Sequence, residues 1–390
     1  MHGTDKSRKD FRNYPAIDLK RYAYIISVKY APGSNKEFVI FGDNLQRKGF
    51  DVRYILAHPY KDLEWVREGS EFITVSNGIR NIFIDFLRYL NGKKIIEIFS
   101  NYPPVFICFY NAHPLNPVIA QLVRRKFPEA VISVYLHDPY KPDKSPYGWK
   151  KSLYISIAEI VQDWTVKYVD HVISPSEYSQ KLFRLRHPSF SGETHLAPLL
   201  IPDTFRNSSQ TRKYFSMVGR AHKATGHDTF IELVNYAAEK DLNFKFCLIS
   251  SSNISGFLER LTEKGRARLR VINKKVITDS EIDEVVCQSY AVFRLAKEVT
   301  QSGVIPVSYM NATPVIATDI PGHSQHVWHG ETGYLVPNNS SPQDIVQAME
   351  YVKAHFYELS RKARKAYKDI WAEWNFDKYY GWLMQLLVNG

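Results

Sequence analysis

The sequence predicts an α/β protein made of two doubly wound parallel-sheet domains that face a central cleft. Short apolar runs of strand length alternate with helical patterns along the chain, and this alternation indicates βαβ units with parallel strands. A polar segment without a pattern, residues 203–212, interrupts the alternation near the middle of the chain. A length of 390 residues also exceeds one ordinary hydrophobic core and suits two domains.

The chain divides into four predicted parts. Residues 1–20 are polar and basic, and we expect a flexible tail there. Residues 21–205 form the first predicted sheet domain, and residues 206–372 form the second. Residues 373–390 have a helical pattern, and we expect this last helix to return to the first domain.

Each predicted domain begins with a strand, a helix and a second strand. In the first domain the turn with Gly33 lies outside the carboxyl end of the first strand, where open α/β sheets hold ligands. The turn lacks the G-x-G-x-x-G pattern, so binding of nicotinamide or flavin cofactors is not expected. The expected strands are 22–28, 52–56, 105–110, 131–136 and 172–174, then 214–218, 244–249, 269–272, 291–293, 315–317 and 333–336. A helix is expected from 155 to 169.

Composition limits the function classes. The net charge of +11 and a pI near 9.2 favour anionic partners such as nucleotides or an anionic membrane surface. We find no aromatic and basic recognition motif, so nucleic acid is not an expected partner. The three cysteines suit buried thiols in a reducing compartment. No apolar run approaches the ~20 residues that span a bilayer, so we expect a cytoplasmic protein, peripheral on the inner face of the membrane if it docks there.

Residues 298–319 predict a polar loop, a short helix and a buried strand. The loop contains Gln301, Ser302 and Gly303, and Pro306 fits the first helical turn, where its missing N–H costs little. Pro314 biases the preceding residue to extended geometry, so the helix should end near Asn311. A glycine-containing helix start can hold a phosphate.

A basic turn follows the first strand of the second domain. It contains Gly219, Arg220, Lys223 and Gly226. Arginine binds a phosphate as a bidentate fork and lysine binds it as a point charge, so this turn suits a diphosphate. In the first domain, His113 and His137 each follow a strand at the predicted cleft.

The second domain resembles the retaining nucleotide-sugar glycosyltransferases of the family-4 type, which have the GT-B fold with two Rossmann-like domains. The blocks that carry the resemblance are Gly219-Arg220 with Gly226-His227-Asp228-Thr229, Glu298 with Gln301-Ser302-Gly303-Val304, residues 313–319 and residues 330–337. The resemblance implies transfer of a sugar from a nucleoside-diphosphate donor to a glycan or lipid-linked acceptor, with retention of configuration. It implies no metal and no cofactor beyond the donor itself, and the sequence lacks an Asp-x-Asp motif.

The resemblance also implies roles for individual residues. Arg220 and Lys223 would stabilise the departing phosphates, backbone N–H groups of the 301–303 loop would assist them, and His137 would face the transferred sugar. The residues that we assign to catalysis are His137, Arg220, Lys223 and Glu298. Those assigned to donor binding are Gly33, Gly219, Thr225, Gln301, Ser302, Gly303 and Val304.

The chain departs from the family pattern at several positions. The family's lysine falls where this chain has Thr225, two residues after Lys223. The family's paired glutamates correspond to Val299 and Val307, and a valine cannot hydrogen-bond a ribose. The alternative to a transferase is therefore a non-catalytic GT-B-like subunit that supports a partner enzyme. An epimerase on the same fold would need acid and base residues around the sugar, and we find no convincing set. The oligomeric state is left open.

Overall fold

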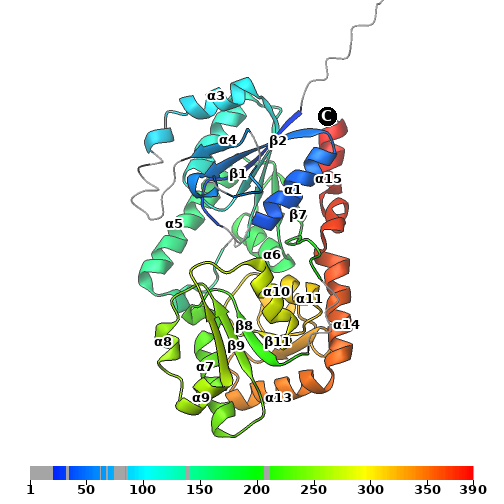
Figure 1. The fold of residues 1–390 in the computed structure, drawn as a ribbon. Helices are drawn as coiled ribbons and strands as arrows, with labels where there is room; N and C mark the ends of the chain where they lie inside the picture. Colours follow the sequence, from blue (N-terminus) through cyan, green and yellow to red (C-terminus); the bar gives the residue numbers. More distant parts are fainter. Residues whose placement is uncertain are drawn as a thin grey trace, which may run out of the picture.

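The computed structural model describes residues 21–31, 35–61, 63–66, 69–73, 84, 87–137, 140–205 and 211–389. The expected tail at residues 1–20 and the turn residue Gly33 lie outside these ranges. The structure describes the backbone of Lys223 but not its side chain. Two sheet domains stack one above the other (Figure 1).

The first sheet confirms the predicted doubly wound class. Its strands lie in the order β3-β2-β1-β4-β5-β6-β7, and the described neighbours pair in parallel. The strand order reverses between β1 and β4, and ligands of such sheets bind at the reversal. The strands are β1 (Arg21–Ser27), β2 (Phe50–Ala57), β3 (Glu71–Ile73), β4 (Pro104–Tyr110), β5 (Val131–Tyr135), β6 (His171–Ser174) and β7 (Glu193–Leu196).

The second sheet repeats this plan. Its order is β10-β9-β8-β11-β12-β13, again with parallel neighbours. Side chains of β12 enter two different cores, because Ile316 packs in one cluster and Val315 and Ala317 pack in another. Apolar layers therefore cover both faces of this sheet. The strands are β8 (Tyr214–Val218), β9 (Phe246–Ser250), β10 (Leu269–Asn273), β11 (Ser289–Arg294), β12 (Val315–Thr318) and β13 (Gly333–Val336).

Helices connect the strands and cover the sheets (Figure 1). In the first domain they are α1 (Asn35–Arg47), α3 (Lys93–Asn101), α4 (Leu115–Lys126), α5 (Trp149–Val166) and α6 (Glu177–Arg186). In the second they are α7 (His227–Glu239), α8 (Ser255–Leu258), α9 (Glu263–Arg268), α10 (Asp279–Cys287), α11 (Val304–Met310), α12 (Pro321–Ser324), α13 (Pro342–Ala354) and α14 (Phe356–Ala366). None of the described helices is long and apolar enough to cross a membrane.

The C-terminal helix α15 (Phe376–Asn389) packs on the first domain (Figure 1). Phe376, Tyr380 and Leu383 belong to the buried core of the first sheet, and the ring of Tyr380 lies 5.0 Å from that of Phe41 on α1. A π-helical turn, Tyr367–Trp371, precedes α15, and the Trp371 carbonyl accepts a hydrogen bond from Ile201 N. The chain thus crosses between the domains near residue 201 and again near residue 371.

Several element boundaries differ from the sequence expectation. The helix expected at 155–169 spans Trp149–Val166, because Gly148, with a φ of 73°, lets the chain turn directly into the helix. The strand expected at 244–249 begins at Phe246. Strands β3 and β7 and helix α3 were not expected, because their short or weakly alternating patterns give little signal. Ser176 caps α6, since its hydroxyl accepts a hydrogen bond from Ser179 N.

Candidate active site

The basic turn after β8 closes at the carboxyl edge of the second sheet. Gly219 has a φ of 115° and donates its N–H to the Ile249 carbonyl, and Arg220 is exposed directly after it. Thr225 organises the turn: its Oγ1 accepts a hydrogen bond from His222 N at 2.9 Å and lies 2.9 Å from His227 Nδ1. The turn is thus held by its own side chains and leaves Arg220 pointing away from the core.

The loop between β11 and α11 lies against this turn. Lys297 N donates a hydrogen bond to the Ala224 carbonyl, and a Cβ on Gly219 would lie 3.9 Å from Val304 Cγ2. Ser302 is buried, and its Oγ has no hydrogen-bond partner among the described residues. Helix α11 spans Val304–Met310 with Asn311 as its C-cap, close to the expected end, but it is only seven residues long.

Arg294, at the end of β11, was not expected as a site residue. Its side chain is buried beneath the two loops, and its Nη1 donates to the Val218 carbonyl at 3.3 Å. Burial lowers the pKa of this guanidinium to about 10, and no described carboxylate forms an ion pair with it. The only sign of Arg294 in the sequence was a charged residue within the apolar run of β11. Site residues were expected in loops, and Arg294 lies within a strand.

Two buried histidines, His227 and His323, lie close to Arg294. Burial, followed by the positive charge of Arg294, lowers the pKa of His227 to about 4 and that of His323 to about 3. Both imidazoles are therefore neutral at physiological pH. The edge of the second sheet holds a buried cation whose charge the described residues around it do not balance.

The first domain contributes more positive charge at the same place. Lys141 Nζ lies 3.6 Å from Glu298 Oε2, and Tyr147 donates its hydroxyl to the same oxygen at 2.9 Å. The ring of Tyr147 also stacks on His222 with centroids 5.9 Å apart. Burial lowers the pKa of Lys151, and the nearby charges of Lys141 and Arg220 lower it further. Basic side chains from both domains, Lys141, Lys151 and Arg220, thus lie close enough for their charges to interact.

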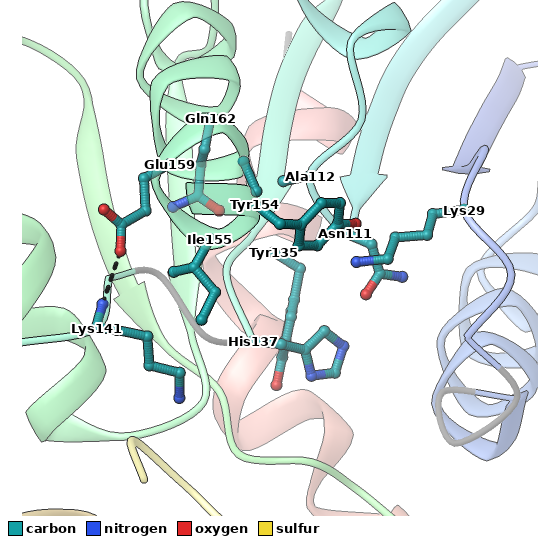
Figure 2. Close-up of a pocket in the computed structure, with 11 residues that line it drawn as sticks. Lys29, Asn111, Ala112, Tyr135, His137, Lys141, Tyr154, Ile155, Glu159 and Gln162 are labelled. Atoms are coloured by element: carbon teal, nitrogen blue, oxygen red, sulfur yellow. Dashed lines mark hydrogen bonds between the residues drawn. The ribbon is translucent and has the colours of Figure 1, made fainter. Parts of the chain in front are cut away.

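His137 lines a pocket of about 220 Å³ at the carboxyl edge of the first sheet (Figure 2). Its Nε2 lies 3.1 Å from Glu37 Oε2, which comes from α1, and its ring lies 4.8 Å from that of Tyr135. Figure 2 shows Lys29 and Lys141 on either side of His137. The lining residues are Lys29, Asn111, Ala112, Tyr135, His137, Lys141, Tyr154, Ile155, Ala158, Glu159 and Gln162.

Lys141 connects the pocket to the second domain, because it lines the pocket and pairs with Glu298. His113 lies outside this pocket: its Nδ1 accepts a hydrogen bond from Leu115 N at 3.1 Å, and burial lowers its pKa to about 4. The structure therefore brings His137, Glu298 and the basic turn toward one region. Gly33 and the side chain of Lys223 lie outside the described residues.

One group of described side chains could hold a metal ion. His171, Glu193 and His195 offer ligand atoms within 4.8 Å of one another on the adjacent strands β6 and β7. The two imidazoles already contact each other, with 3.0 Å between His171 Nδ1 and His195 Nε2, and Trp382 stacks on His195 at 3.6 Å. His171 and Glu193 begin their strands, so the group lies away from the carboxyl edge that carries His137.

The fold is that of the GT-B glycosyltransferases. The structure resembles a sucrose-phosphate synthase from Thermosynechococcus elongatus with a TM-score of 0.73, 18% identity and coverage of 95% of this chain and 100% of that one. It also resembles the HepE protein of Anabaena in complex with UDP, with a TM-score of 0.69, 13% identity and coverage of 93% and 99%. At such low identities these likenesses show the fold alone.

Residues 212–354 match the family model of the group 1 glycosyl transferases. This part contains the basic turn, Arg294 and the 298–304 loop. A curated relative, glycosyltransferase 1 domain-containing protein 1 of Xenopus tropicalis, is 31% identical over 121 residues, which is 30% of this chain. The match spans about a third of that relative's length, 34%.

Proposed function

We propose that this chain is a retaining glycosyltransferase of the family-4 type. It moves a sugar from a nucleoside-diphosphate donor to a glycan or lipid-linked acceptor without a metal ion. The observation that carries the proposal is the convergence of Lys141, Lys151 and Arg220 from two domains on the site above buried Arg294. The family match over residues 212–354 supports it, and HepE, a neighbour in fold, is described in complex with UDP-glucose.

The proposed chemistry follows from the charges. Negative charge builds up on the diphosphate as the bond to the sugar breaks, and Arg220 and Lys223 stabilise that charge. Arg294 supplies a fixed positive potential from below, where low dielectric strengthens it. His137 faces the transferred sugar from the first domain. The donor-binding backbone is that of Gly219 and the 301–304 loop, and Gly33 and Thr225 complete the predicted set.

A thermal-shift screen with UDP, GDP, dTDP, CDP and ADP, with and without EDTA, tests the proposal. A bound nucleotide stabilises the fold by ~2.7 kcal/mol at a hundredfold excess over its dissociation constant. We expect one nucleotide to raise the melting temperature regardless of EDTA, and Arg220→Ala to remove the shift. The exposed Lys264→Ala variant on α9 is the control. A shift that is absent for every nucleotide, or equal in Arg220→Ala, would contradict the proposal.

A non-catalytic subunit is the second candidate, and one observation favours it. Val299 and Val307 occupy the positions of the family's paired glutamates, and Val307 packs against the apolar cluster around Tyr309 and Trp371. Donor hydrolysis and transfer assays separate the two candidates. Tight nucleotide binding without turnover, in the presence of varied acceptors, would favour the subunit.

We also place the protein on the cytoplasmic side of the membrane, as a peripheral protein. The net charge of +11 supports an affinity for anionic lipid. Fractionation of cells into soluble and membrane parts, with a high-salt wash, checks this placement.

A further inference from the structure

Helix α5 has an exposed apolar face. Trp149 and Ile160 are 74% and 62% exposed, and they belong to a set on this one helix. The set is Trp149, Leu153, Ile157, Ile160 and Trp164, called the α5 stripe below. Spacings of three and four residues place these side chains along one side of the helix.

Helix α5 exposes apolar side chains and buries mostly polar ones, which is the reverse of an ordinary surface helix. Its buried residues are mostly polar: Glu159, Gln162 and Thr165, together with Val166. Glu159 and Gln162 line the pocket that contains His137. The core of the domain therefore does not explain the α5 stripe, because the side chains of the stripe are exposed.

The charges on α5 fit an anionic surface. Its two carboxylates point to partners within the protein: Lys144 Nζ lies 2.6 Å from Glu159, and Arg186 lies 2.6 Å from Asp163. Lys150 is exposed beside Trp149, with its Nζ 5.4 Å from the Trp149 ring. Lys167 is exposed just after the other end. Figure 1 shows α5 along the outer side of the first domain.

The α5 stripe continues into the protein. Ile157 lines a small apolar cavity of about 60 Å³ together with Tyr154 and Ala158. Tyr154 and Ala158 also line the polar pocket of His137. Tyr154 and Ala158 therefore form a wall that the two cavities share.

We propose that α5 lies in the surface of an anionic bilayer. The two tryptophans sit at the headgroup level, the aliphatic side chains between them enter the acyl boundary, and the lysines meet lipid phosphates. This docking does not depend on the transferase chemistry. One consequence rests on the proposed function: the acceptor is then lipid-linked and reaches His137 from the side of α5.

Vesicle flotation tests the docking with the full chain. We expect the protein to float with vesicles of phosphatidylcholine and phosphatidylglycerol and much less with phosphatidylcholine alone. The variant Leu153→Glu/Ile160→Glu should lose binding by about tenfold or more, because charged groups replace the inserted side chains. The matched control is Leu185→Glu on α6, where the leucine is 69% exposed on a different helix. Unchanged thermal midpoints show that each variant folds.

The outcomes separate the docking from the proposed function. Wild-type protein that stays in the buffer with anionic vesicles, or equal loss in Leu185→Glu, would overturn the docking. Wild-type dimers in light scattering that the stripe variant abolishes, without vesicle binding, would also overturn it and assign the stripe to a second copy of the chain. The nucleotide thermal shift is measured on the same samples, so a retained shift without flotation refutes the docking alone.

Discussion

Lys141 Nζ lies 3.6 Å from Glu298 Oε2, and this ion pair joins the two domains at the candidate active site. Both side chains are only 11% exposed, so the pair is shielded from solvent. Lys141 lines the pocket of His137, and Glu298 follows the strand that ends with Arg294. The pair therefore connects the proposed acceptor side to the proposed donor side.

The first prediction concerns the coupling between these two residues. In a double-mutant cycle with Lys141→Met and Glu298→Gln, we expect a coupling energy of about 1 kcal/mol or more in the free energy of unfolding, because contacting shielded charges are not additive. Denaturant unfolding of the four proteins measures it. Additive effects of the two changes would show that the pair does not stabilise the domain arrangement.

Replacement of Arg294 by methionine should separate stability from binding. A buried cation without a paired carboxylate costs desolvation energy, so Arg294→Met should leave the thermal midpoint unchanged or raise it. The same variant should weaken nucleoside-diphosphate binding by about tenfold or more, since it removes the fixed positive potential. Calorimetric titration measures the binding, with the exposed Arg270→Met on β10 as control. An unchanged affinity for the nucleoside diphosphate would show that Arg294 does not contribute to binding.

Gly226 should not tolerate a side chain. Its φ of 80° is left-handed, and a Cβ there would overlap the Leu295 carbonyl oxygen. We expect Gly226→Ala to lower the free energy of unfolding by about 2 kcal/mol or more. Gly381 lies inside α15 with open space around it, so Gly381→Ala should instead stabilise by ~0.5–1 kcal/mol. Similar effects of the two substitutions would contradict the interpretation that the backbone of the basic turn requires glycine at position 226.

Stability should fall on mild acidification. Burial lowers the pKa of five histidines to between about 3 and about 4, namely His113, His195, His227, His323 and His326. The unfolded chain takes up protons near pH 6.5, while the folded chain stays neutral at these sites until the pH approaches 4. Their contribution to stability is thus complete above pH 6.5 and is lost between pH 6.5 and 4.

Thermal melts between pH 7.5 and 4.5 check this expectation. The melting temperature should fall steadily below pH 6.5, and His326→Gln should reduce the slope. His355→Gln, at an exposed position on the second domain, is the control. A melting temperature that is flat or rises on acidification to pH 5 would contradict the prediction.

The sequence by itself determined the class of fold and many of its elements. Strands β8 and β13 coincide with the expected 214–218 and 333–336, and α11 ends at Met310, next to the expected Asn311. Such elements depend on local rules: apolar runs of strand length, helix caps and the restriction before proline. The basic turn and the 298–304 loop could be located in the same way, because each follows a strand directly.

Only the tertiary structure decided how these parts combine. Arg294 lies in an apolar strand, and its place beneath the candidate site appears only when the loops close over it. The pairing of Lys141 with Glu298 joins segments of different domains, and no local pattern encodes it. The α5 stripe has a helical period, but the period does not tell whether the core or the solvent faces it. Those relationships depend on contacts between distant residues, which the fold creates and local sequence does not contain.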